Sequence, residues 1–239
     1  MHIGILGCGL MGSKLGTLFA RAGHDVTFSY SRSRQKLERL ARNAGAKAHA
    51  GTPAEAARDA DAILLAVHWT HLDEVLTQAG TLSGKVLLTC SLPMSKDGTH
   101  LVIGHTTSGA EALAVKAPKA HVVSAFSTVP SEVLFPVFEK RREGRPPDLI
   151  FCGDDRRAKN MTAGLTRDVG FNPVDLGPLS TACYIEPFSL LVAQLAYDSS
   201  GSPALAYRFE RFPNHATQLL RFPQASKKEV LVSLIYRTS

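Results

Sequence analysis

Residues 2–12 have the sequence HIGILGCGLMG, in which a short apolar run leads into a cluster of glycines. The run predicts a buried strand, and the apolar spacing of residues 11–22 predicts a helix directly after it. A strand, a Gly-x-Gly-x-x-Gly turn and a helix together form the dinucleotide-binding turn of a βαβ unit. Gly7 would make the tight turn, Gly9 would let a pyrophosphate approach the backbone, and Gly12 would let the helix pack on the strand. The alternative is a glycine-rich turn that binds nothing.

The alternation of strands and helices continues beyond this unit. Strands are predicted at residues 25–30, 62–67, 85–89, 121–125, 149–152 and 173–175. Helices are predicted at residues 35–43 and 156–169, and after the capping boxes that begin at Thr52 and Ser108. This order predicts an α/β fold with a Rossmann-like doubly wound parallel sheet. We expect the sheet domain to span residues 1–178, a small C-terminal helical portion to span 179–212, and a tail of unknown role to span 213–239.

The C-terminal helical portion contains a long apolar stretch, residues 182–197, which Pro187 interrupts. The stretch is apolar on more than one side, so a helix that faces solvent is not expected. Burial against a second subunit and packing under the sheet both explain this pattern, and the sequence leaves the two open.

Composition and charge exclude several classes of protein. With 239 residues, 44% of them apolar and 20% charged, the chain is not disordered, collagen-like or a coiled coil. No run approaches 18 uninterrupted apolar residues, so no membrane span is expected. The four cysteines lie far apart and form no C-x-x-C pair, which favours a reduced, cytoplasmic setting. The net charge is +6, but its basic runs at 32–42 and 140–145 lack interleaved aromatic residues, which argues against a nucleic-acid partner.

The end of the second predicted strand indicates which dinucleotide would bind. A site for NAD usually has an acidic residue there, which holds the ribose hydroxyls. Residues 29–34 are SYSRSR and contain no acid. Ser31 and Arg32 would bind a 2′-phosphate, and Arg34 and Lys36 would add positive potential. The sequence therefore predicts NADP(H), and the alternative is a solvated basic start of a helix.

The ends of the later strands carry mostly hydroxyl and apolar side chains. Val67, His68 and Trp69 follow one strand, Ser127 follows another, and His105 lies in the loop between them. Ligands of such sheets lie beyond the carboxyl ends of the strands, so these groups suit the faces and amide of a nicotinamide. His105 could donate a proton or serve only as a hydrogen-bonding loop residue. No nucleophile–base pair is present, so no catalytic residue is assigned, and hydride transfer between two stacked ring cofactors is favoured.

A metal site is not expected. His68 and His71 are three residues apart, a spacing that is possible for a pair of metal ligands. No carboxylate or cysteine completes a set around them. They are therefore predicted to be capping or surface histidines.

These motifs resemble the NADPH-dependent reductases of the deazaflavin coenzyme F420, especially their bacterial branch. The resemblance covers residues 1 to about 212. The segments that carry it are residues 7–12, 31–32, 66–69, 124–130, 152–155, 158–159, 169–171, 174–179 and 184–187. The glycine turn fits any Rossmann enzyme, whereas Gly-Asp-Asp at 153–155 and the Gly-Pro-Leu and Glu-Pro segments at 177–179 and 186–187 are more specific.

The resemblance implies an N-terminal dinucleotide domain, a small C-terminal portion, a dimer, and reversible hydride transfer between a nicotinamide and a deazaflavin lying over it. The positions that match cofactor contacts in this family are Leu10, Met11, Ser31, Arg32, Lys36, Val67 and Trp69. The chain departs from many relatives at His68, at Phe126-Ser127 and in a longer segment at 102–108, all on the acceptor side. The fold is also similar to the cytoplasmic domain of mammalian ferrireductases, which pass hydride from NADPH to a flavin.

The sequence is compatible with three functions. The leading hypothesis is hydride transfer between NADPH and a small-molecule acceptor, either coenzyme F420 or a flavin such as FMN or FAD. The second is an NADP-dependent reductase of a small carbonyl or imine, for which His105 is the nominated proton donor. The third is a redox sensor that binds NADP(H) without turning it over.

Overall fold

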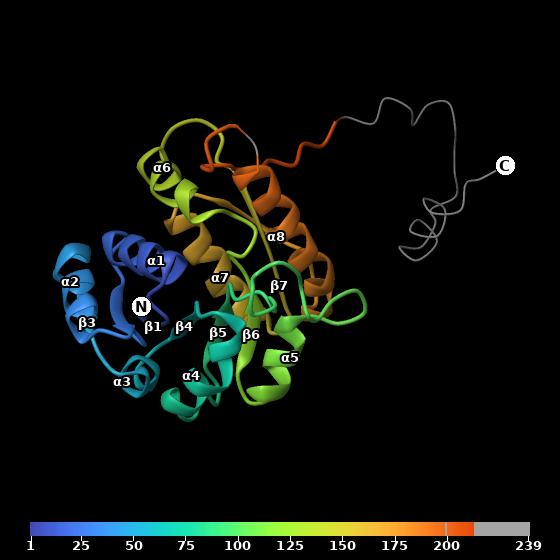
Figure 1. Cartoon of the computed structure of the whole chain (residues 1–239). Coiled ribbons are helices and arrows are strands. Elements are labelled where there is room, and N and C mark those ends of the chain that lie inside the picture. The colour runs from blue at the N-terminus through green and yellow to red at the C-terminus, as the bar shows by residue number, and fades with distance from the viewer. Residues whose placement is uncertain (199, 213–239) are drawn as a thin grey trace, which may run out of the picture. The chain divides into compact units, whose positions relative to one another are not determined.

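The computed structural model describes residues 1–198 and 200–212. Within these residues, eight strands form one sheet in the order β3-β2-β1-β4-β5-β6-β7-β8 (Figure 1). The strands are β1 (His2–Leu6), β2 (Asp25–Ser29), β3 (Ala48–Ala50), β4 (Ala62–Leu65), β5 (Val86–Thr89), β6 (His121–Ser124), β7 (Asp148–Gly153) and β8 (Asn172–Asp175). Neighbours from β3 to β6 pair in parallel, with Ile5 of β1 in register with Phe28 of β2 and Leu64 of β4.

Helices cover both faces of this sheet. They are α1 (Leu10–Arg21), α2 (Arg34–Ala44), α3 (Pro53–Arg58), α4 (Leu72–Ala79), α5 (Gly109–Lys116), α6 (Leu134–Glu139), α7 (Arg156–Asp168) and α8 (Ala182–Tyr197). One apolar cluster joins the strands to α1, α2, α6 and α7, and a second joins them to α3, α4, α5 and α8. The predicted fold class, a Rossmann-like doubly wound sheet, is confirmed.

The elements differ from the prediction in two respects. The short elements β3, α4 and α6 were not predicted, since three to eight residues show too little periodicity to be recognised. The sheet is also not wholly parallel, because β7 pairs antiparallel to β6, with Ser124 opposite Cys152. A strand buried on both faces has the same apolar pattern in either direction, so the pattern does not encode this reversal.

Helix α8 packs under the sheet on one side only, so burial of its other side against a second subunit stays a prediction. Ile185, Ser189 and Val192 are buried on one side, where α8 packs against α5 and β7. On another side, large apolar side chains are more than half exposed: Tyr184 (68%), Leu191 (53%) and Leu195 (56%). By length and mean hydropathy (1.2) the segment Leu179–Tyr197 could cross a membrane, but 44% of it is buried inside the protein. A core helix of a soluble fold passes the same criterion.

Met1–Arg208 form one compact unit. The division predicted between residues 178 and 179 stays a prediction about domain organisation. The predicted tail, residues 213–239, lies outside the described residues.

Candidate functional site

The glycine turn lies between β1 and α1. Gly7 has a φ of 109°, and a Cβ on it would lie 2.5 Å from the Ala66 carbonyl oxygen. A Cβ on Gly12 would collide with the carbonyl oxygen of Gly7, so the close packing of helix on turn requires glycine at both positions. Gly9 faces open space and is the N-cap of α1, with no side chain capping the helix. The turn therefore offers an anion the open, positive end of a 12-residue helix.

A cavity of about 810 Å³ opens beside this turn. Its walls come from the turn, from the β2–α2 segment, from the β3–α3 segment and from the residues that follow β4. The predicted site residues that line it are Gly7, Gly9, Ser31, Arg32, Arg34, Lys36, Val67 and His68. The structure thus brings together the glycine turn and the basic segment, which lie more than 20 residues apart in the sequence.

One end of the cavity is basic and rich in hydroxyl groups. Ser33 is the N-cap of α2, and its Oγ accepts a hydrogen bond from the Lys36 amide at 3.3 Å. The Ser33 amide in turn donates to Ser31 Oγ at 3.4 Å, which fixes the curve of the segment. Arg34 forms an exposed pair with Glu38 at 3.2 Å, whereas neither Arg32 nor Lys36 forms an ion pair with any described residue. Two cations at a helix N-terminus suit a phosphate dianion.

The cavity lining also contains residues that were not predicted as site residues. Tyr30 lies in the left-handed region, with a φ of 55°, and its ring centroid is 6.5 Å from that of His71. Burial and a hydrogen bond to Glu74 raise the pKa of Tyr30 to about 12, so the hydroxyl remains a donor. Gln78 Nε2 donates to Glu74 Oε1 at 3.0 Å. His71, Glu74 and Gln78 belong to the segment around α4, and predicting that helix would have placed them here.

The remaining predicted residues lie outside the cavity lining. Leu10, Met11 and Gly12 form the first turn of α1, and Leu10 is exposed. Trp69 opens a 3₁₀ turn, Trp69–His71, whose N-cap is His68; the His68 Nδ1 lies 2.9 Å from Thr70 Oγ1.

His105 and Ser127 lie in the loops that follow β5 and β6. His105 is exposed and has a φ of 65°. Ser127 Oγ accepts a hydrogen bond from Ser189 of α8 at 3.1 Å. These loops follow strands whose carboxyl ends share the edge of the sheet with the glycine turn.

A buried carboxylate holds the start of α5 at this edge. Glu186 of α8 is 2% exposed, and its two oxygens accept from the amides of Gly109 at 2.9 Å and Ala110 at 3.0 Å. Burial raises the pKa of Glu186 to about 7, against the lowering effect of the two amides. The Glu-Pro segment at 186–187 thus anchors the end of the loop that contains His105.

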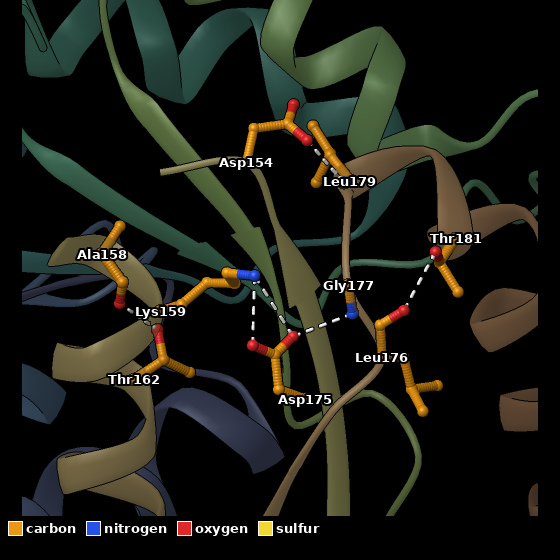
Figure 2. A network of polar contacts seen from close by, with 9 residues as sticks. All are labelled: Asp154, Ala158, Lys159, Thr162, Asp175, Leu176, Gly177, Leu179 and Thr181. Atoms are coloured by element: carbon orange, nitrogen blue, oxygen red, sulfur yellow. Dashed lines mark hydrogen bonds and ion pairs between the residues drawn. The ribbon is translucent and has the colours of Figure 1, made fainter. Parts of the chain in front are cut away.

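The Gly-Asp-Asp and Gly-Pro-Leu segments lie at the opposite edge of the sheet. Asp175 accepts from Lys159 at 3.1 Å and from the Gly177 amide at 2.8 Å, and Asp154 accepts from the Leu179 amide at 2.9 Å (Figure 2). His121, at the start of β6, lies 3.7 Å from Asp155, which places the network at the amino end of β6. These segments position the start of α8 and do not line the cavity.

Comparison with known proteins agrees with this geometry. Residues 2–93 match the family "NADP oxidoreductase coenzyme F420-dependent". The metalloreductase STEAP3 of Rattus norvegicus is 31% identical over 188 residues, which are 79% of this chain and 36% of that protein. The chain therefore spans about a third of the length of this curated relative.

Many solved structures share the fold, including the following two. A candidate F420-dependent NADP-reductase from Arthrobacter sp. FB24 aligns over 88% of this chain and all of its own, with a TM-score of 0.77 and 24% identity. The hypothetical protein SMa0349 from Sinorhizobium meliloti aligns over 88% of this chain and 96% of its own, with a TM-score of 0.68 and 27% identity. The match of residues 2–93 and the shared fold agree with the residues that carry the resemblance, and this N-terminal part of the chain is similar to the coenzyme F420-dependent NADP oxidoreductase family.

Proposed function

We propose that this protein binds NADPH and transfers its hydride to a deazaflavin of the coenzyme F420 type or to a flavin. The observation that carries the proposal is the cavity that joins the glycine turn to the basic segment. Residues 29–36 contain no carboxylate, so nothing in this segment repels a 2′-phosphate.

Different residues of the cavity would hold different parts of the dinucleotide. The open backbone at Gly9 and the start of α1 would hold the pyrophosphate, and Ser31, Arg32 and Lys36 would hold the 2′-phosphate. Val67 and His68 line the inner end of the cavity, where the nicotinamide would enter the edge of the sheet. The bound dinucleotide supplies the hydride, and the protein supplies orientation and the exclusion of water.

The identity of the acceptor rests on several lines of support. The family description names coenzyme F420, and the curated relative is named a metalloreductase. The groups that follow β5 and β6 are mostly hydroxyl and apolar, which suits a flat ring better than an acid–base reaction at a small substrate. The net charge of +6 also favours an anionic acceptor.

The direct test is to mix the full chain with NADPH and oxidised coenzyme F420 and to record the absorbance of both. FMN and FAD are tested in parallel, each with a control that lacks the protein. We expect NADPH oxidation to match acceptor reduction one to one. Binding of NADPH without oxidation by any of the three acceptors would contradict the proposal and favour the sensor.

A second candidate is the NADPH-dependent reduction of a small carbonyl or imine. The observation in its favour is the left-handed backbone of His105, because strained residues of this kind cluster at functional sites. If His105→Ala abolished turnover of a small substrate but left NADPH binding unchanged, His105 would be the proton donor. Unchanged turnover by this variant would exclude that role.

A further inference from the structure

The part of the cavity lining around α4 contains a carboxylate, Glu74. We propose that Glu74 selects the adenine of the cofactor by accepting a hydrogen bond from its 6-amino group. This inference rests on the proposed function, because it concerns the cofactor that the cavity would bind. It adds a second specificity element to the basic segment.

The cavity is divided by charge. Arg32, Arg34 and Lys36 line one end, whereas Glu74, the carboxylate in the cavity lining, lies with His71 on the wall formed around α4, beside the Tyr30 ring. The adenosine end of NADPH has a phosphate on the ribose and an uncharged base. A phosphate is attracted to the cations and repelled by the carboxylate, so the base is left for the wall that contains Glu74.

Neighbouring side chains hold the Glu74 carboxylate but leave some of its hydrogen-bond acceptor positions unoccupied. Oε1 accepts from Gln78 at 3.0 Å and Oε2 lies 3.7 Å from His71 Nδ1, and the Tyr30 hydroxyl is near enough for Glu74 to raise its pKa. A carboxylate has about four acceptor positions, so further hydrogen bonds can form. The neighbouring side chains fix the orientation of the group before a ligand arrives, which lowers the entropic cost of binding.

The polarity of the carboxylate determines which base it favours. An ionised carboxylate only accepts hydrogen bonds, and the 6-amino group of adenine only donates them. In hypoxanthine a carbonyl oxygen replaces that amino group, and two acceptors would face each other. Tyr30 and His71 add ring surface beside Glu74, against which a purine can pack.

The test compares NADPH with its hypoxanthine analogue, in which a carbonyl oxygen replaces the 6-amino group and N1 carries a hydrogen. Dissociation constants are measured by calorimetry for the wild-type chain, Glu74→Gln and Asp73→Asn. Asp73 is the matched control, because it lies on the same helix, loses the same charge, does not line the cavity and bonds to Lys116 of α5.

We expect the wild-type chain and Asp73→Asn to prefer NADPH by about tenfold, the effect of one hydrogen bond to a charged group at a half-open site. In Glu74→Gln the preference falls to about threefold or less, because the amide can donate to a carbonyl as well as accept. A wild-type ratio near one, or a full preference in Glu74→Gln, would overturn the inference while the proposed function stands. Failure of the wild-type chain to bind NADPH would overturn both.

Discussion

Arg32 and Lys36 occupy the basic end of the cavity, and neither has a carboxylate partner among the described residues. Their charges are therefore available to a ligand without the breaking of an internal ion pair. Glu74, in the cavity lining around α4, already has three neighbours and is oriented by them. At the scale of single residues, the proposed site thus has one end whose charge suits a phosphate and a carboxylate that suits the amino group of a base.

Arg32→Ala tests the phosphate end. We expect NADPH to bind about tenfold or more weakly, because one charge-assisted contact to phosphate is lost, while the affinity for NADH changes by less than about threefold. The measurement is the dissociation constant of each cofactor by calorimetry. Arg39→Ala, an exposed change on α2 outside the cavity lining, is the matched control. Equal losses for the two cofactors would show that Arg32 does not recognise the 2′-phosphate.

Gly9 and Gly12, at the start of α1, separate binding from stability. Gly9→Ala puts a methyl group into open space, so we expect weaker NADPH binding and a loss of stability of about 1 kcal/mol or less, since alanine is a poorer N-cap than glycine. Gly12→Ala drives a methyl group into the Gly7 carbonyl, and we expect a loss of about 2–4 kcal/mol in the free energy of unfolding. Urea denaturation and calorimetry on both variants check this. A stable Gly12→Ala protein would contradict the close packing of α1 on the turn.

At the scale of elements, the sequence is most informative where one segment carries several agreeing signals. Strand β1, the turn and α1 could be predicted because an apolar run, spaced glycines and a helical pattern follow one another within 22 residues. The wall around α4 could not be predicted, because its eight residues bury only Leu72, Val75 and Ala79. The basic end of the cavity was therefore foreseen, whereas Tyr30, His71 and Glu74 come together only through the fold.

The contact between α8 and α5 makes the stability of the fold depend on pH. The pKa of Glu186 is raised from 4.5 to about 7 in the folded chain, so the folded state binds its proton more tightly than the unfolded state does. This contribution to stability is present below pH 4.5 and is lost as the pH rises towards about 7, by about 3 kcal/mol in total. Denaturation of the wild-type chain and Glu186→Gln across this range measures it.

We expect the difference in unfolding free energy between wild type and Glu186→Gln to change by about 3 kcal/mol between pH 4.5 and about 7. Ser189→Ala, one turn along α8, has no titrating group and should give a difference that is independent of pH. Parallel pH profiles for the wild type and Glu186→Gln would mean that the carboxylate keeps an ordinary pKa in the folded chain.

At the scale of the whole molecule, we propose that α8 mediates a homodimer. Tyr184, Leu191 and Leu195 lie seven and four residues apart, so they follow one side of the helix, and each is more than half exposed. An apolar stripe of this kind marks an interaction surface more often than a free one. The opposite side of α8 already packs on α5 and β7, so the stripe is free for a second copy.

Leu191→Arg combined with Leu195→Arg should convert the protein to a monomer, because the interface would have to bury two unpaired charges per subunit. Light scattering coupled to size-exclusion chromatography measures the mass of each form over a range of concentrations. Val115→Arg is the control, since this residue is 79% exposed on α5 and lies outside the stripe, and this variant should stay dimeric. A monomeric wild-type chain, or a dimeric double variant, would show that α8 is not the interface. NADPH binding by the monomer should persist, because no residue of the stripe lines the cavity.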